Sequence, residues 1–351
     1  MQARDRRREQ KVMMEIGVGI VGTGIMGGDH AQALAGSIKG AALVAVHDRD
    51  PKRASSLAAA TGVVRVHADA AALIGDPGVE AVVIASPDPT HEELVLACLA
   101  ARKPVLCEKP LAPSIDGCLR ILAAETALGR RLVQVGFMRR FDPGYRAVQR
   151  ALAAGGIGAP LLLHCTHRNA SVPPSFDSTM LIGNSAVHEI DAARWLLADE
   201  FAFATVFSPA DRRPEALRDP QFIVLETRRG VLVDIEVFVT ARYGYDVRAE
   251  LVCEAGTLTL APQAPVRTRF AGQQLSPFAE DWRAHFAEAY RNQLQAWIRA
   301  IRSGNPTGAS AWDGYAATAT AAACLEALRT GTRTRVELAD RPDLYGDDER
   351  R

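Results

Sequence analysis

The residues best suited to chemistry lie in two short stretches of the sequence. In the first, GIVGTGIMG, three glycines have the spacing G-x-G-x-x-G. They follow a β-branched run and open a helical stretch, which is the context that this spacing needs to bind a dinucleotide. The glycines allow a tight turn, a close approach to a pyrophosphate and close helix–strand packing, and the helix N-terminus adds N–H donors. The candidate turn consists of Gly22, Gly24, Ile25, Met26 and Gly27.

An acidic residue ends the next apolar run and bears on the choice of cofactor. Asp48 closes the run 42–48, where a carboxylate can accept hydrogen bonds from the ribose hydroxyls of NAD. The 2'-phosphate of NADP would meet the same negative charge, so Asp48 favours NAD. Arg49 keeps NADP open as a second cofactor, because an arginine there can accept that phosphate.

The second stretch is LCEKPLA, 106–112, which contains the last lysine of the chain. Only five of the 41 basic residues are lysines, and none follows Lys109. Lys109 ends a predicted parallel strand, where ligands bind in open α/β sheets, and lysine can lose a proton when its surroundings shift its pKa. Its position leaves two interpretations, a catalytic group and an exposed surface lysine. Pro110 admits a cis Lys109–Pro110 bond.

Further along, NSAVHEIDAARWLL, 184–197, has a polar stripe. Asn184, His188 and Asp191 are spaced i, i+4, i+7, which places them on one face of a predicted helix, 184–198. They could form a site. Alternatively, Asn184 or Ser185 caps the helix and His188 is merely solvated.

The pattern of apolar runs divides the chain near residue 137. The predicted strands of the first part are 16–22, 42–48, 79–86, 104–109 and 131–137, and its predicted helices are 26–38, 51–61, 91–100 and 115–129. Such alternation implies βαβ units and a parallel sheet covered on both faces. In the second part the predicted strands are 160–168, 202–208, 221–228, 231–240, 245–253 and 256–260, and the predicted helices are 143–154, 184–198, 281–302 and 311–329. This order favours an open, largely antiparallel sheet with helices on one face.

Composition excludes several classes of function. The formal net charge is zero, which argues against nucleic acid or an anionic membrane as the main partner, and no apolar run approaches the roughly 18 residues of a membrane span. Six cysteines without C-x-x-C spacing favour reduced thiols in a cytoplasmic protein. His164 and His167 would face opposite sides of a strand, so we predict no metal site. We expect residues 1–14 to be a disordered leader and 338–351 a mobile tail.

Six segments, in the same order, resemble a known family. They are GIVGTGIMG, CEKPLA, GFMRRFDPGY, HRNASVPP, NSAVHEIDAARWL and YGYDVRAELV. Together they resemble the glucose–fructose oxidoreductase-like (Gfo/Idh/MocA) dehydrogenases, and more closely the inositol 2-dehydrogenase branch. The combination of E-K-P, H-R-N and H-E-I-D at these separations is specific, whereas the glycine spacing is not. The resemblance implies a Rossmann domain over 15–137 and an α/β domain with a large open, mainly antiparallel sheet over 138–337. It also implies a homotetramer.

The reaction implied by the resemblance is oxidation of one hydroxyl of myo-inositol, with hydride passing to NAD. Lys109 would hydrogen-bond the reacting hydroxyl and His188 would accept its proton as general base. Glu108 would lie near the nicotinamide. The other candidate contacts are Ser86 and His91 for the cofactor, and Arg139, His167, Asn169, Asp191 and one of Tyr243 or Tyr245 for the polyol.

Asn184 departs from the pattern of inositol dehydrogenases, which usually carry an aspartate there. Asparagine can orient His188 or Lys109 by hydrogen bonds but adds no negative charge, so the departure bears on the substrate more than on the reaction type. The alternatives are therefore a dehydrogenase of another stereoisomer such as scyllo-inositol, or of an aldose or hexopyranose. A third is a non-catalytic, NAD-binding regulator, against which the presence of both Lys109 and His188 argues.

Overall fold

The computed structural model describes residues 15–63, 65–209, 217–261 and 268–346. The expected leader, 1–14, lies outside these ranges. The chain forms two units. The first comprises residues up to Phe137 together with Tyr290–Tyr315 and Arg341–Gly346, and the second comprises Met138–Ala289 and Ala316–Asp340.

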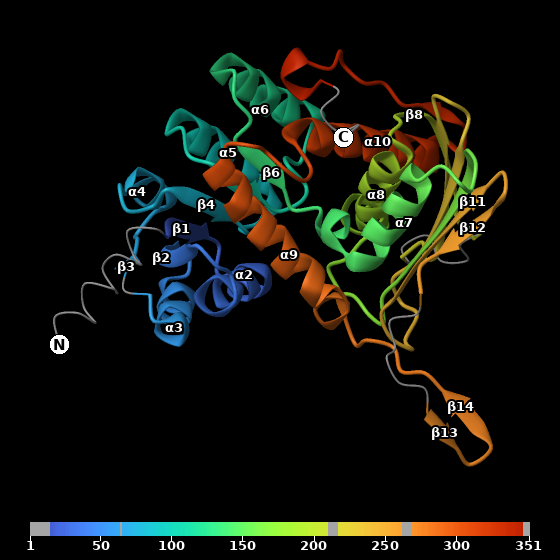
Figure 1. Cartoon of the computed structure of the whole chain (residues 1–351), viewed down its shortest axis with the longest axis horizontal. Coiled ribbons are helices and arrows are strands. Elements are labelled where there is room, and N and C mark those ends of the chain that lie inside the picture. Colours follow the sequence, from blue (N-terminus) through green and yellow to red (C-terminus); the bar gives the residue numbers. More distant parts are fainter. Residues whose placement is uncertain (1–14, 64, 210–216, 262–267, 347–351) are drawn as a thin grey trace. The chain divides into compact units, whose positions relative to one another are not determined.

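The first unit is built on a six-stranded parallel sheet in the order β3-β2-β1-β4-β5-β6 (Figure 1). Its strands are β1 (Ile16–Val21), β2 (Ala41–His47), β3 (Arg65–Val66), β4 (Ala81–Ile84), β5 (Val105–Cys107) and β6 (Val133–Val135). Every residue of β1 and β4 is buried, as their continuous apolar runs predict for a sheet covered on both faces. The strand order reverses between β1 and β4, and ligands bind at such a switch point, beyond the carboxyl ends of the strands.

Helices cover this sheet where the sequence predicts them. They are α2 (Ile25–Gly36), α3 (Pro51–Thr61), α4 (Ala70–Gly75), α5 (His91–Ala100) and α6 (Ile115–Leu128), with a 3-10 turn, η1 (Asp88–Thr90). Local chemistry sets their ends: Asp50 caps α3, Ser114 caps α6, and Gly129 ends α6 in the left-handed conformation at φ +63°. The short α4 and β3 were not predicted.

The chain returns to the first unit near its C-terminus, which the predicted boundary between the domains does not show. Helix α9 (Trp282–Ser303) brings Leu294, Trp297 and Ile298 into the same core as β1 and α2.

The expectation of a mobile tail is wrong for residues 341–346. Tyr345 is 1% exposed, and its hydroxyl donates to the buried carboxylate of Glu125 at 2.5 Å. Residues 347–351 lie outside the described ranges.

The second unit contains a seven-stranded mixed sheet in the order β12-β11-β7-β10-β9-β8-β15. Its strands are β7 (Pro160–Arg168), β8 (Phe201–Phe207), β9 (Gln221–Thr227), β10 (Leu232–Phe238), β11 (Asp246–Cys253), β12 (Gly256–Thr259) and β15 (Thr334–Arg335). All pairs are antiparallel except β7 with β10. Alternate residues of β9 and β10 are buried, as expected for a sheet with one covered face.

Helices of the second unit pack on one face of this sheet (Figure 1). They include α7 (Pro143–Ala153), α8 (Val187–Leu197) and the later part of α10 (Ala311–Thr330), with a 3-10 turn, η2 (Met138–Phe141), and a π-helical turn, η3 (Leu181–Ala186). A two-stranded hairpin of β13 (Thr268–Phe270) and β14 (Gln273–Leu275) completes the unit. Among the described residues, no helix is long and apolar enough to cross a membrane.

Candidate active site

The glycine turn of the first unit joins β1 to α2 and fits a dinucleotide phosphate. Gly22 has φ +92°, and a Cβ on Gly27 would lie 1.8 Å from the carbonyl oxygen of Gly22, so both positions require glycine for the fold itself. A Cβ on Gly24, in contrast, would meet no atom within 4 Å. The protein therefore leaves open space at Gly24, at the start of α2, where a pyrophosphate can approach the backbone.

Asp48 lies at the carboxyl end of β2 and is fixed to this turn. Its Oδ2 accepts hydrogen bonds from the backbone N–H of Thr23 at 2.7 Å and from the Thr23 hydroxyl at 2.9 Å. Burial alone would raise the pKa of Asp48, but hydrogen bonds from the backbone of Asp50 and from Thr23 hold it below its ordinary value. The carboxylate is thus anionic at neutral pH, and its contact with ribose hydroxyls stays a prediction. Thr23 lies inside the glycine motif, but its two hydrogen bonds to Asp48 were not predicted.

Lys109 follows β5 at the carboxyl edge of the sheet and is half-buried. The Lys109–Pro110 bond is cis. His91, predicted to contact the cofactor, is 1% exposed, and its ring nitrogens lie 2.7 Å from the carbonyl oxygen of Pro110 and 2.9 Å from that of Ser86. His91 therefore joins the loops that follow β4 and β5, and its contact with the cofactor stays a prediction.

Glu108, beside Lys109, has a partner that the sequence did not indicate. Nε2 of His30 lies 2.8 Å from Oε1 of Glu108, and the two residues are 1% and 7% exposed. His30 stands on α2, three residues after Gly27, and this fixed offset from the glycine motif is the only signal that could have pointed to it.

The candidate polyol contacts of the second unit surround a buried ion pair. Arg139 donates to Glu189, and both residues are 1% exposed. Burial alone would raise the pKa of Glu189, but Arg139 and His167 lower it below its ordinary value. Nδ1 of His167 lies 3.0 Å from each oxygen of Glu189. Since a carboxylate oxygen accepts, Nδ1 of His167 donates to Glu189, and Nη2 of Arg139 lies 3.3 Å from the same nitrogen.

Aromatic rings connect this ion pair to His188. The ring centroids of His167 and His188 are 6.5 Å apart, and Tyr245 packs edge-on against His167 at 5.7 Å and against His285 at 5.3 Å. Burial first, and then the charge of Arg139, lowers the pKa of His285 to about 4, so its ring is neutral at pH 7. His285 was not predicted as a site residue.

The two tyrosine candidates differ in their contacts, because Tyr243 does not belong to the group around His167. It is 44% exposed, donates to Asp246 at 2.7 Å and accepts from Arg168 at 3.0 Å. Tyr245 is 3% exposed and belongs to the group around His167. Asn169, directly after β7, is half-buried.

The helix that carries His188 differs from the prediction. Asn184 is in the π-helical turn η3, and regular α-helix begins only at Val187. The common face of Asn184 and His188 stays a prediction, and π-helical turns often occur at functional sites. Asp191 is fully buried and paired with Arg140, at 3.0 and 2.7 Å, and its contact with a polyol stays a prediction.

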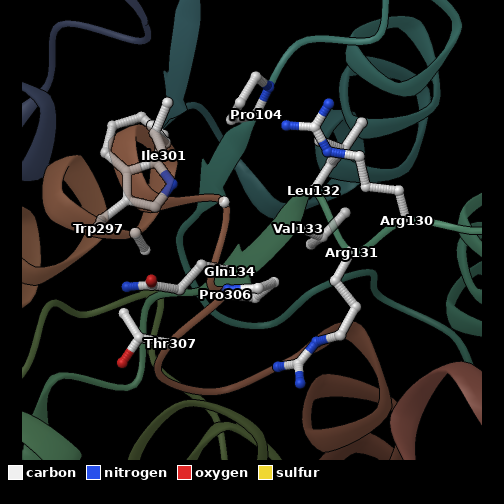
Figure 2. A pocket seen from close by; sticks show the side chains of 12 residues that line it. Pro104, Arg130, Arg131, Leu132, Val133, Gln134, Trp297, Ile301, Pro306 and Thr307 are labelled. Carbon is white, nitrogen blue, oxygen red and sulfur yellow. The ribbon is translucent and has the colours of Figure 1, made fainter.

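A small cavity in the first unit contains none of these residues. It measures about 40 Å³ and lies at the amino ends of β5 and β6, whereas Lys109 and the glycine turn lie at carboxyl ends. Its lining includes Gln134, Trp297 and two arginines, Arg130 and Arg131 (Figure 2). The described residues include no group of three or more His, Cys, Asp or Glu placed to hold a metal ion.

Comparisons with known proteins match nearly the whole chain. Residues 16–137 match the GFO_IDH_MocA model, described as an oxidoreductase family with an NAD-binding Rossmann fold, and residues 149–338 match the C-terminal alpha/beta domain of the same family. Inositol 2-dehydrogenase 1 of Saccharopolyspora erythraea is 54% identical over 336 residues, covering 95% of this chain and 100% of that protein.

Solved structures of this family share the fold. Myo-inositol dehydrogenase from Lactobacillus casei, in complex with NAD(H) and myo-inositol, has a TM-score of 0.91 and 36% identity, covering 95% of this chain and 100% of that one. Scyllo-inositol dehydrogenase from the same organism, with NAD(H) and scyllo-inositol bound, has a TM-score of 0.84 and 25% identity, covering 92% and 99%.

Proposed function

The chain belongs to the Gfo/Idh/MocA family of oxidoreductases, and from this membership we propose that it oxidises one ring hydroxyl of myo-inositol to a ketone, with NAD as the hydride acceptor. The observation that carries the proposal is the 54% identity to an inositol 2-dehydrogenase along the full length of that relative. The first unit supports NAD, because Gly24 leaves room for a pyrophosphate and the Asp48 carboxylate is poised for ribose hydroxyls.

We propose that Lys109 and His188 handle the hydroxyl proton. NAD, when bound at the glycine turn, supplies the acceptor for the hydride. Lys109 donates a hydrogen bond to the reacting oxygen and stabilises the negative charge that develops there, and His188 takes the hydroxyl proton as general base. Asn184, in the usual position of an aspartate, orients one of these groups without adding a charge. Glu108 is proposed to lie beside the nicotinamide, with Ser86 and His91 in the neighbouring loops.

The residues around Glu189 are proposed to bind the other hydroxyls. His167 has Nε2 left for a substrate hydroxyl, since its Nδ1 lies 3.0 Å from both oxygens of Glu189. Of the two tyrosines, we propose Tyr245 as the polyol contact, because it packs on His167 while Tyr243 is engaged with Arg168 and Asp246. Arg139 and Asn169 are proposed as further contacts, and Asp191 as a residue that acts by fixing Arg140. A site that hydrogen-bonds each hydroxyl can discriminate strongly between stereoisomers.

We also propose that the protein uses NAD in preference to NADP, works in the cytoplasm and assembles as a homotetramer. The negative charge of Asp48 opposes a 2'-phosphate, although Arg49 is exposed beside it. Free, buried cysteines fit a reducing compartment.

Assembly as a homotetramer is supported by two exposed aromatic side chains. Phe207 and Phe222 are paired across β8 and β9 and are 56% and 42% exposed on the uncovered face of the sheet. Sedimentation of the wild type and of Phe222→Glu tests the assembly.

Initial rates of cofactor reduction test the function. NAD and NADP would be offered separately with myo-inositol, scyllo-inositol, chiro-inositol, glucose, xylose and galactose. We expect turnover with NAD and myo-inositol. Turnover on another polyol alone would keep the reaction and change the substrate. NAD binding without turnover on any of these substrates would contradict the proposal and favour a regulator or a nucleotide-linked substrate.

The role of Lys109 has its own test. Lys109→Arg keeps a positive donor but removes the group that can share a proton, so we expect it to lose most turnover while NAD still binds. Near-wild-type turnover would rule out the assignment.

A further inference from the structure

We propose that His30 is a positioning residue for the reaction, acting through Glu108 on the strand end that carries Lys109. The inference rests on the proposed role of Lys109 in the dehydrogenase reaction. His30 is a buried histidine on α2, the helix that opens at the glycine turn.

Glu108 is held on two sides within the first unit. Its Oε1 lies 2.8 Å from Nε2 of His30, and a Cβ on Gly136 would approach its Oε2 to 2.7 Å. The carboxylate therefore lies flat against the backbone of Gly136, in space that any other residue at 136 would fill. The backbone N–H of Glu108 donates to the carbonyl oxygen of Ile84. Main chain and side chain of Glu108 are thus both fixed.

His30 is itself fixed. It is 1% exposed, and the ring of Tyr290, on α9, packs edge-on against it with centroids 6.1 Å apart and planes at 74°. Because a carboxylate oxygen accepts, Nε2 of His30 donates the hydrogen bond to Oε1. The bond joins residues 78 positions apart in the sequence. It ties α2, which begins at the phosphate turn, to the end of β5.

This bond has a consequence for Lys109, the next residue along the chain. A buried carboxylate without a donor is costly, so the Glu108 side chain would rotate away from its present position. That rotation would move its charge from beside Lys109 and loosen the backbone from which the lysine side chain extends. A misplaced donor stabilises the developing alkoxide less. Loss of His30 should therefore slow the chemical step more than it weakens binding of NAD or polyol.

Four variants test this with NAD and myo-inositol: His30→Leu, His30→Gln, Glu108→Gln and the double variant His30→Leu/Glu108→Gln. A hydrogen bond to a charged group corresponds to roughly 10- to 100-fold, so we expect His30→Leu to lower kcat by at least about 10-fold, with both KM values changed by less than about 3-fold. His30→Gln, which can still donate to Oε1, should recover most of the rate. The double variant should be no slower than Glu108→Gln, because His30 acts only through Glu108.

A second histidine–carboxylate pair in the same unit supplies a matched control. Nε2 of His67 lies 3.0 Å from Oδ2 of Asp76, next to the edge strand β3. We expect His67→Leu to lower the melting temperature without changing kcat. If His30→Leu behaves in the same way, His30 is only structural and the proposal is wrong. Multiplicative losses in the double variant would also overturn it, since His30 would then act independently of Glu108.

Two further measurements separate this proposal from the proposed function. Wild type and Lys109→Arg are assayed alongside: silence of the wild type, or full activity of Lys109→Arg, contradicts the proposed function. An active wild type and a slow Lys109→Arg, with His30→Leu at full rate, contradict only the role of His30. Should His30→Leu not fold, His30→Asn replaces it, because asparagine is polar but too short to reach Oε1, and the same loss of kcat is expected.

Discussion

Two glycines of the phosphate turn should respond in opposite ways to the same added methyl group. Gly24 has φ −67° and ψ −160°, and a Cβ there would meet nothing within 4 Å. Gly24→Ala should therefore cost only about 0.5–1 kcal/mol of stability, the usual cost of alanine at a helix N-cap. The methyl group would, however, occupy the space through which a pyrophosphate reaches the helix N-terminus. Loss of one hydrogen bond to a charged group, about 1.5–3 kcal/mol, weakens NAD binding by roughly 10- to 100-fold.

Gly27→Ala should damage the fold itself. Its Cβ would lie 1.8 Å from the carbonyl oxygen of Gly22, far inside contact distance, so the turn between β1 and α2 must open. We expect a loss of about 3 kcal/mol or more, which lowers the melting temperature by roughly 6–12 °C for a unit of this size. Replacement at Gly24 should lower it by only about 1–4 °C.

Thermal unfolding and calorimetric titration with NAD measure both effects. The two variants differ by the position of one methyl group, so each is the control for the other. If Gly24→Ala binds NAD as tightly as the wild type does, the pyrophosphate does not lie over this glycine and the assigned cofactor site is wrong. If Gly27→Ala has the same melting temperature as the wild type, the packing of α2 on β1 is not as described.

Three further predictions concern single side chains. Asp48→Ala removes the charge that opposes a 2'-phosphate and should move the ratio of kcat/KM for NAD over NADP toward NADP by at least about 10-fold; an unchanged ratio in initial-rate assays would show that Asp48 does not select the cofactor. Glu189→Leu leaves Arg139 buried without its partner and should lower the free energy of unfolding in urea by about 3–5 kcal/mol; a loss below about 1 kcal/mol would contradict the ion pair. Tyr345→Phe removes the donor to buried Glu125 and should lower that free energy by about 1–3 kcal/mol, whereas a mobile C-terminal segment would give no change.

Most of the fold could be predicted from the sequence because its local signals agree with its tertiary environment. The buried strands β1 and β4 are continuous apolar runs, and Pro51 and Gly129 mark helix ends. Two of the missed elements, β3 and β15, have two residues each, which is too short for any periodicity to show. The return of α9 to the first unit could not be predicted, since an amphipathic helix does not reveal which core its apolar face covers.

The candidate site was predicted less completely, for a related reason. A motif identifies residues such as Lys109 and His188, but their neighbours in space come from distant segments. Asp191 illustrates this: its position on the helix was evident, yet its pairing with Arg140 depends on how η2 packs against α8. The π-helical turn at Asn184 has no signature in residue spacing, so the sequence could not show that regular α-helix begins only at Val187.

The two proposed catalytic residues are anchored in a similar way, which bears on how each can change its protonation state during turnover. Glu108 precedes Lys109 and is held by His30, while Glu189 follows His188 and is held by Arg139 and His167. In both cases the adjacent glutamate is buried, and its partner comes from another element of the same unit. The neighbour thus fixes the backbone from which the proposed catalytic side chain extends. A lysine or histidine locked in a buried ion pair would have its pKa shifted away from neutrality and would exchange protons poorly. The contacts of the adjacent glutamate fix the geometry without taking the proposed catalytic side chain into those contacts.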